Sequence, residues 1–125
     1  MPLVKIYVRR NIAEPDLHAI SGAVHEALVA EANVPADDRF HILNRLDVNE
    51  IVAHPTYGGV NRSDEIVVIE ITLNAGRTVE VKKNLYAGIA KRLEVLGVRP
   101  DDVLVSLIEV TKENWSFGGG RATYA

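Results

Sequence analysis

The most regular segment of the chain is Ile66-Val67-Val68-Ile69-Glu70-Ile71-Thr72-Leu73, whose β-branched side chains predict a strand. The turn Asn74-Ala75-Gly76-Arg77 follows, and Thr78 is a suitable N-cap for a helix. That helix is predicted by apolar residues at three- and four-residue spacing, namely Val81, Leu85, Ile89, Leu93 and Leu96. Gly97 suits the position just beyond a helix, where a positive φ is common, and Val103–Ile108 is the expected second strand.

The same order of elements occurs earlier in the chain. A strand is expected at Leu3–Val8 and another at Arg39–Asn44. Between them, Pro15 suits a first helical turn, where no amide donor is needed. The apolar positions of this helix are Leu17, Ile20, Val24 and Leu28. The chain is therefore interpreted as a duplication.

Each expected helix leads into a valine-containing turn with a pair of aspartates. The first pair is Asp37-Asp38 and the second is Asp101-Asp102. We interpret residues 1–125 as one domain. It consists of two β-α-β repeats at about 2–46 and 66–110, a linking loop at 47–65 and a C-terminal tail at 111–125.

The duplication predicts an α+β fold. A helical crossover joins parallel strands within each repeat and is expected to be right-handed. Two such repeats predict a four-stranded mixed sheet with both helices on one face. The strands of the second repeat carry apolar residues at consecutive positions, which suggests burial on both faces. Other copies of the chain are the simplest cover for the second face, so an oligomer is expected.

Composition excludes several classes of protein and site. The 125 residues carry 14 basic and 17 acidic side chains, a net charge of −3, which argues against a nucleic-acid binder. There is no cysteine, so a disulfide scaffold, a thiolate zinc site and a cysteine nucleophile are excluded. No apolar run approaches the roughly 20 residues of a membrane span. Met1–Lys5 lacks the pattern of a signal peptide, so a cytoplasmic location is expected.

Neither a metal nor a dinucleotide cofactor is expected. The four histidines, His18, His25, His41 and His54, are scattered, without the spacing of metal ligands. His25 falls near the apolar stripe of the first helix and is interpreted as a buried structural residue. Gly118-Gly119-Gly120 lies at the end of the chain with no helix after it, which a dinucleotide fingerprint requires.

Several segments together resemble the tautomerase superfamily. Pro2 follows the initiator methionine and opens a strand in a duplicated chain. The turn 74–78 resembles the Gly-Arg-Ser turn of 4-oxalocrotonate tautomerase and cis-3-chloroacrylic acid dehalogenase. Val34–Phe40 and Asn114–Ala122 resemble stretches of malonate semialdehyde decarboxylase. The resemblance implies a homotrimer and cofactor-free chemistry on a small carboxylate substrate.

Pro2 is the first candidate catalytic residue implied by this resemblance. Removal of Met1 would expose a secondary amine, and an ordinary α-amino group has a pKa of roughly 7.7–8.0. Burial among apolar groups lowers the pKa of an amine, which makes a neutral general base available near pH 7. Two alternatives remain open. Pro2 is also suited to the first position of a strand, and a retained Met1 would convert its nitrogen into an amide.

Arg77 is the second candidate catalytic residue. Its guanidinium can hold a carboxylate in a bidentate fork at a strand-to-helix turn. A pseudo-twofold axis between the repeats would bring it towards Pro2. The alternative is a solvated arginine in a turn. Asn74 is a candidate substrate-binding residue at a position where the dehalogenase and the decarboxylase carry another arginine. Its neutral amide can donate to an oxyanion, but it weakens the expected carboxylate clamp.

Asp38 is the third candidate, at the position of the acid that the decarboxylase places beside its amino-terminal proline. Such a carboxylate could raise the pKa of the amine, orient water or polarise a carbonyl. The alternative is turn chemistry, which the equivalent pair Asp101-Asp102 supports. Trp115 and Phe117 are candidates for the apolar wall of the substrate pocket, with core packing as the alternative.

These residues predict a keto–enol tautomerase that acts on a small 2-oxo acid without a cofactor. One alternative is a decarboxylase, hydratase or dehalogenase of a small three-carbon acid, which Asp38 and the Trp-Ser-Phe tail favour and Asn74 disfavours. Another is a non-catalytic homologue that keeps the scaffold, because a fold alone does not establish an activity.

Overall fold

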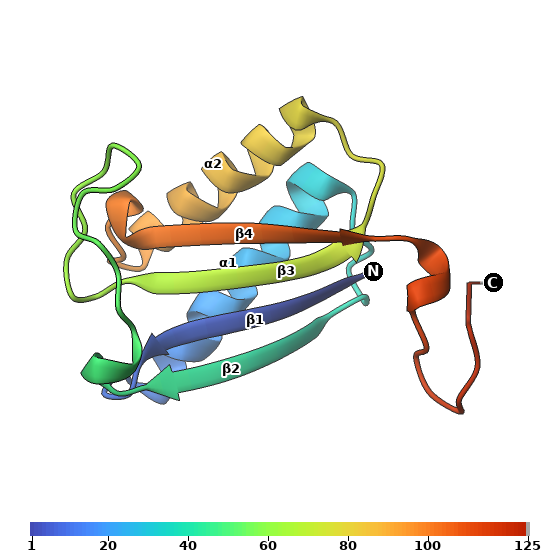
Figure 1. Cartoon of the computed structure of the whole chain (residues 1–125), viewed down its shortest axis with the longest axis horizontal. Coiled ribbons are helices and arrows are strands. Elements are labelled where there is room, and N and C mark those ends of the chain that lie inside the picture. The colour runs from blue at the N-terminus through green and yellow to red at the C-terminus, as the bar shows by residue number, and fades with distance from the viewer. Residues whose placement is uncertain (125) are drawn as a thin grey trace.

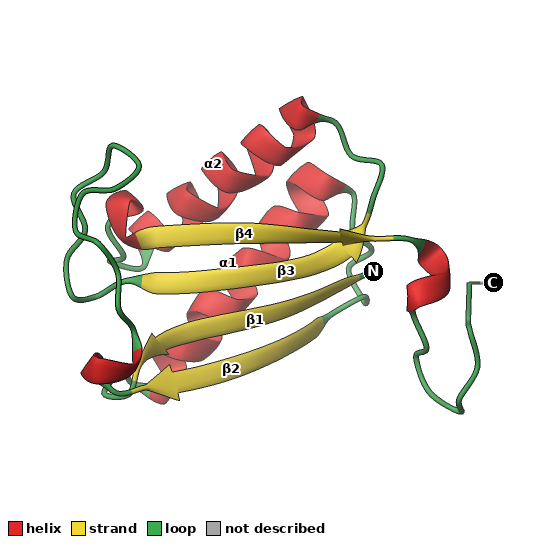
Figure 2. Ribbon diagram, viewed as in Figure 1, coloured by secondary structure: helices red, strands yellow, loops and turns green. Residues whose placement is uncertain are grey.

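The computed structural model describes residues 1–124, so the last residue of the expected tail, Ala125, lies outside the described residues. Figures 1 and 2 show one sheet with both helices packed behind it. The elements in chain order are β1 (Pro2–Arg9), α1 (Glu14–Ala32), β2 (Phe40–Leu46), β3 (Val67–Asn74), α2 (Val79–Val95) and β4 (Val103–Val110). Three short 3₁₀ turns complete the fold. One follows β2 at Val48–Glu50, one precedes β4 at Pro100–Asp102, and one begins the tail at Lys112–Asn114.

The strand order β2-β1-β3-β4 confirms the predicted mixed sheet. β1 runs parallel to β2, and β3 runs parallel to β4, as each β-α-β repeat requires. The two repeats meet where β1 lies antiparallel to β3, with Pro2 opposite Leu73. The start of β1 therefore lies at the end of β3, and the start of β3 lies at the end of β1.

Local sequence signals set the helix boundaries. Pro15 occupies the first turn of α1, and Asn33 ends this helix with φ 57°. The Thr78 side chain accepts a hydrogen bond from the Val81 amide, which confirms the expected N-cap of α2. Gly97 follows this helix with φ 91°, a conformation that costs glycine little.

The core lies between the sheet and the two helices. Alternate residues of the central strands point into it, and Val4, Ile6, Ile69 and Ile71 are fully buried. They meet the apolar stripes of the two helices, which supply Leu17, Ile20, Val24, Leu28, Leu85, Ile89 and Leu93.

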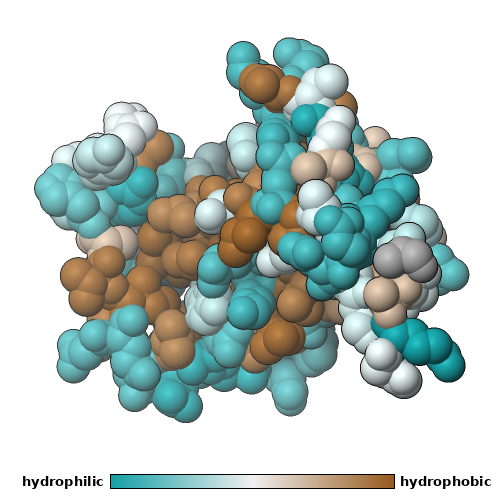
Figure 3. Space-filling model, turned by 45° about the vertical axis from the view of Figure 1, so that its right-hand side comes forward, coloured by the Kyte–Doolittle hydropathy of each residue, from teal (hydrophilic) through white to brown (hydrophobic). Residues whose placement is uncertain are grey.

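The opposite face of the sheet is open in the single chain. β3 alternates between buried and half-buried residues, so the expected double burial is not reached within one chain. Four large apolar side chains of the edge strands remain 37–50% exposed, namely Phe40, Ile42, Leu104 and Ile108. Figure 3 shows apolar residues gathered in brown across this side of the molecule. Within residues 1–124, no helix combines the length and apolar character that a membrane crossing requires.

Candidate functional site

The amino terminus and Asp38 meet at one end of the sheet. Parallel pairing places Phe40 beside Leu3, so the turn before β2 lies next to the start of β1. The α-amino nitrogen of Met1 lies 3.3 Å from Asp38 Oδ2, and their side chains are only 6% and 17% exposed. Pro2 is buried. The second oxygen, Oδ1, is buried without a hydrogen-bond partner. One carboxylate oxygen therefore faces the terminal amine and the other is available to a further donor.

Arg77 and Asn74 enter the same end from β3. Pro2 pairs with Leu73, and Asn74 is the next residue, where β3 ends. The Arg77 guanidinium donates from Nε and Nη2 to the Ala32 carbonyl at 3.1 and 2.9 Å, and from Nη1 to the Asn74 carbonyl at 3.2 Å. Ala32 ends α1, where unpaired carbonyls favour a cation. These contacts fix the plane of the guanidinium, and two of its five N–H groups remain for a ligand.

Trp115 ties the tail to this end of the sheet. Its indole Nε1 donates to Asn74 Oδ1 at 2.7 Å. The Asn74 amide nitrogen therefore keeps its donors for a ligand. Phe117 stacks on Trp115 with ring centroids 6.0 Å apart and on Phe40 with centroids 6.4 Å apart. Tyr124 meets Phe117 edge-on at 5.1 Å. The tail thus forms an aromatic wall beside the start of β1.

The six site residues proposed from the sequence are linked by these contacts at one end of the sheet. They are Pro2, Asp38, Asn74, Arg77, Trp115 and Phe117. The sequence interpretation did not include Phe40 and Tyr124 in the wall. Phe40 is the first residue of a strand, where an aromatic residue is ordinarily packed within the sheet, so spacing alone gave no signal for its place in the wall.

A polar cluster lies behind Asp38, between α1 and β2. Ser21 Oγ lies 2.8 Å from His41 Nδ1 and accepts a hydrogen bond from Arg39 Nη2 at 2.9 Å. His25 Nε2 lies 2.8 Å from the Ala36 carbonyl. The pKa of His41 is lowered to about 4, first by burial and then by the charges of Arg39 and His25. The sequence did contain a signal for this cluster, because Ser21 and His25 are polar positions near the apolar stripe of a helix.

The other end of the sheet holds the corresponding parts of the second repeat. Asp102, only 1% exposed, accepts from the Ser63 amide at 2.7 Å and from the Ser63 hydroxyl at 2.6 Å. Arg99 Nη1 lies 3.5 Å from its Oδ2. β3 begins here at Val67, inside the chain, so this end has no terminal amine. Asp102 is a structural residue that fastens the loop before β3.

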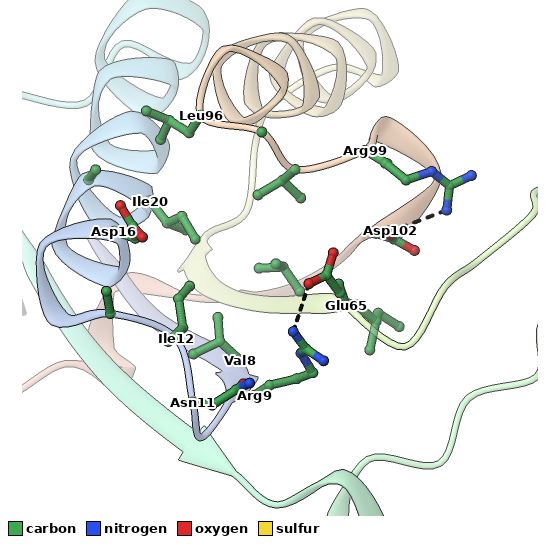
Figure 4. Close-up of a pocket in the computed structure, with 16 residues that line it drawn as sticks. Val8, Arg9, Asn11, Ile12, Asp16, Ile20, Glu65, Leu96, Arg99 and Asp102 are labelled. Carbon is green, nitrogen blue, oxygen red and sulfur yellow. Dashed lines mark hydrogen bonds and ion pairs between the residues drawn. The ribbon is translucent and has the colours of Figure 1, made fainter.

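A cavity of about 410 Å³ opens beside Asp102, and Figure 4 shows its lining. Its apolar walls include Val8, Ile12 and Ile20. At its edge, Arg9 is paired with Glu65 at 2.7 Å. The sequence did not predict this cavity. Two ion pairs, Arg9–Glu65 and Arg99–Asp102, occupy charged groups of this lining, whereas Asp38 Oδ1 at the opposite end has no hydrogen-bond partner.

Within residues 1–124, no group of three or more His, Asp or Glu side chains is arranged to hold a metal ion. The chemistry that the site offers comes from an amine, a carboxylate, a guanidinium and an amide beside an aromatic wall. Such a set can bind a small carboxylate and transfer a proton.

Comparisons with protein families, curated proteins and solved structures agree with one another. Residues 38–118 match a family model described as "Tautomerase enzyme". Probable tautomerase YusQ of Bacillus subtilis (strain 168) is 42% identical over 98% of this chain and 97% of its own length. A crystal structure of FG41 malonate semialdehyde decarboxylase inhibited by 3-bromopropiolate is 38% identical, with a TM-score of 0.92 over 98% of this chain and 93% of its own. Another malonate semialdehyde decarboxylase, described with decarboxylase and hydratase activities, is 32% identical with a TM-score of 0.90, covering 98% and 95% of the two chains.

Proposed function

Because the chain belongs to the tautomerase family, we propose that it catalyses keto–enol tautomerisation of a small 2-oxo acid with Pro2 as general base and acid. Removal of Met1 would place a secondary amine at the start of β1. Met1 and Pro2 are adjacent, with Cα atoms about 3.8 Å apart, so this amine would stay close to Asp38. The observation that carries the proposal is the 3.3 Å contact between the terminal nitrogen and Asp38.

In the proposed reaction Pro2 moves one proton. Its neutral nitrogen takes the proton of the enol hydroxyl and then delivers a proton to the neighbouring carbon, which yields the keto acid. A carboxylate beside an amine favours the protonated amine, and a water-poor surround favours the neutral amine. Asp38 and the buried position of Pro2 therefore act in opposite directions, which suits a group that must both accept and donate.

Arg77 and Asn74 would hold the substrate. The two remaining N–H groups of Arg77 can bind the substrate carboxylate, and the Asn74 amide can donate to the oxygen where negative charge develops. Trp115 and Phe117 would cover the substrate and exclude water, which strengthens both interactions by lowering the local dielectric.

The test combines mass and activity. Intact mass spectrometry shows whether Met1 is removed, and ketonisation of phenylenolpyruvate is then followed for the wild type, for Pro2→Ala and for protein that retains Met1. We expect the Met1-retaining form to lose about 10²–10⁴-fold in rate, the usual contribution of general acid–base catalysis. Equal rates for all three forms would remove Pro2 from the mechanism and favour a non-catalytic or different role.

A second candidate function is decarboxylation of a 3-oxo acid such as malonate semialdehyde. Two observations favour it: the similarity to malonate semialdehyde decarboxylases and the presence of Asp38 and Trp115 in the same site. Asn74 stands against it, because a neutral amide binds a carboxylate more weakly than an arginine does. Incubation with malonate semialdehyde or an acetylenic acid, followed by product NMR, separates the two functions. No turnover of either compound would reject the second.

We also propose that the chain acts as a homotrimer. The half-exposed apolar residues on the open face of the sheet are a surface that copies of the chain can bury against one another. Light scattering coupled to size-exclusion chromatography tests this directly. A charge on this face, Ile108→Lys, is expected to dissociate the assembly; a monomeric wild type would overturn the proposal.

A further inference from the structure

The cluster behind Asp38 supplies an inference that rests on the proposed function. Asp38 lies in the segment between Val34 and Phe40. Residues before and after this aspartate are joined to α1 by hydrogen bonds. Ala36, two residues before it, is bonded to His25. Arg39 and His41, after it, are bonded to Ser21.

Ser21 and His25 are four residues apart on α1, a spacing that places them on one face of the helix. A carbonyl oxygen only accepts, so His25 Nε2 carries the hydrogen that reaches Ala36. Ser21 accepts from Arg39, which leaves its own hydrogen to donate to His41 Nδ1. His41 is then neutral, with its hydrogen on Nε2, in agreement with its lowered pKa.

We propose that Ser21 and His25 are positioning residues that fasten the chain on both sides of Asp38 and so set the place of its carboxylate beside the terminal nitrogen. The turn itself contains one backbone bond, from the Asp38 amide to the Pro35 carbonyl at 3.0 Å. Its residues 35–37 are exposed, so packing contributes little to holding it. The bonds to α1 supply the missing anchor.

The readout is the pKa of the Pro2 amine in protein from which Met1 has been removed, measured by NMR of ¹⁵N-labelled protein, together with the pH profile of kcat/KM. Asp38→Asn removes the neighbouring charge and is expected to lower this pKa by about 1–3 units, the usual effect of an opposite charge at 4–6 Å. His25→Leu removes the donor to Ala36 but keeps Asp38. It is expected to lower the pKa in the same direction by about 0.5–1 unit, a fraction of that effect.

Three further variants give the experiment its controls. His25→Gln keeps an amide donor near the place of Nε2 and is expected to behave as the wild type. His18→Leu removes an exposed histidine of the same helix and should leave both readouts unchanged. Ser21→Ala is a small change that tests the other side of Asp38 if His25→Leu folds poorly, and it should also lower the pKa. In an Asp38→Asn background, His25→Leu should have no further effect.

The outcomes distinguish the positioning role of Ser21 and His25 from the proposed function of Pro2. A lowered pKa in His25→Leu and Ser21→Ala, restored in His25→Gln, supports the positioning role. If Asp38→Asn lowers the pKa but neither α1 variant does, the positioning role is wrong and the proposed function stands. If Asp38→Asn itself has no effect, Asp38 is not coupled to the amine, and both the positioning role and the part of Asp38 in the proposed mechanism fail.

Discussion

At one end of the sheet Asp38 faces the amino terminus, and at the other end Asp102, its counterpart in the second repeat, faces Ser63. Both aspartates hold the segment that leads into the first strand of their own repeat. Asp102 is fully buried, and both of its oxygens accept hydrogen bonds from Ser63. Asp38 keeps one buried oxygen without a partner. The same position in the fold is thus saturated in one repeat and chemically available in the other.

The difference shows what a duplicated fold can do with equivalent parts. The second repeat begins inside the chain, so a loop residue saturates its aspartate and the role is structural. The first repeat begins at the chain terminus, where the partner is an amine rather than a backbone amide. The difference in chemistry therefore follows from the partner that each aspartate faces, and mutations at the two ends of the sheet should affect different properties.

The largest expected effect is a loss of activity at the end of the sheet that holds Asp38. Asp38→Asn should lower kcat/KM for phenylenolpyruvate ketonisation by about 10²–10⁴-fold, because the amine loses the carboxylate that supports its protonated form. Its free energy of unfolding should change little, since the carboxylate is bonded to the terminus alone. A large loss of stability with normal kcat/KM would assign Asp38 a structural role instead.

At the end of the sheet that holds Asp102, we expect a loss of stability rather than a loss of activity. Asp102→Ala should lower the free energy of unfolding by about 1.5–3 kcal/mol, because it removes the buried carboxylate that accepts hydrogen bonds from the Ser63 amide and hydroxyl. Chemical denaturation measures the loss, and kcat/KM of the folded fraction should match the wild type. If Asp102→Ala abolished activity in a protein of normal stability, the contrast between the two ends would fail.

The arginines at the two ends provide the next test. Arg77→Lys loses the planar fork and should lower kcat/KM by about 10–100-fold through a higher KM, consistent with roughly 1.5–3 kcal/mol for hydrogen bonds to a charged group. Arg9→Gln removes the arginine paired with Glu65 at the cavity and serves as the matched control. Steady-state kinetics should show no change for Arg9→Gln; equal losses in both variants would argue against a specific role for Arg77.

The smallest expected effect concerns pH. The folded-state pKa of His41 is about 4 and its ordinary value is 6.5. The unfolded chain therefore binds this proton first as the pH falls. Stability is fully present above about pH 6.5 and decreases between pH 6.5 and 4, by about 1–2 kcal/mol once the partial exposure of the ring is allowed for. His41→Gln should flatten this part of a denaturation profile, and an unchanged slope would place the titration elsewhere.

Much of the fold could be predicted because its signals are local. Helix spacing, the Thr78 cap and the repeated Asp pair indicated the elements and their order. The expected strand boundaries differ from the observed ones by no more than two residues. The expected approach of the turn after β3 to the start of β1 followed from relating the repeats by a pseudo-twofold axis, whereas the pairing of Pro2 with Leu73 is known only from the structure. The contacts of Ser21, His25 and His41 did not follow, because which polar groups meet between a helix and a strand depends on packing that spacing does not specify.

Covalent labelling of the terminal amine tests the central claim most directly. A related decarboxylase is inhibited by 3-bromopropiolate, and this electrophile can be incubated with protein lacking Met1 and with protein retaining it. Peptide mass spectrometry then locates the adduct. We expect a single adduct on the Pro2 nitrogen, formed more slowly in Arg77→Lys and not found on Pro2 when Met1 is present. Labelling at another residue, or an equal yield with and without Met1, would contradict it.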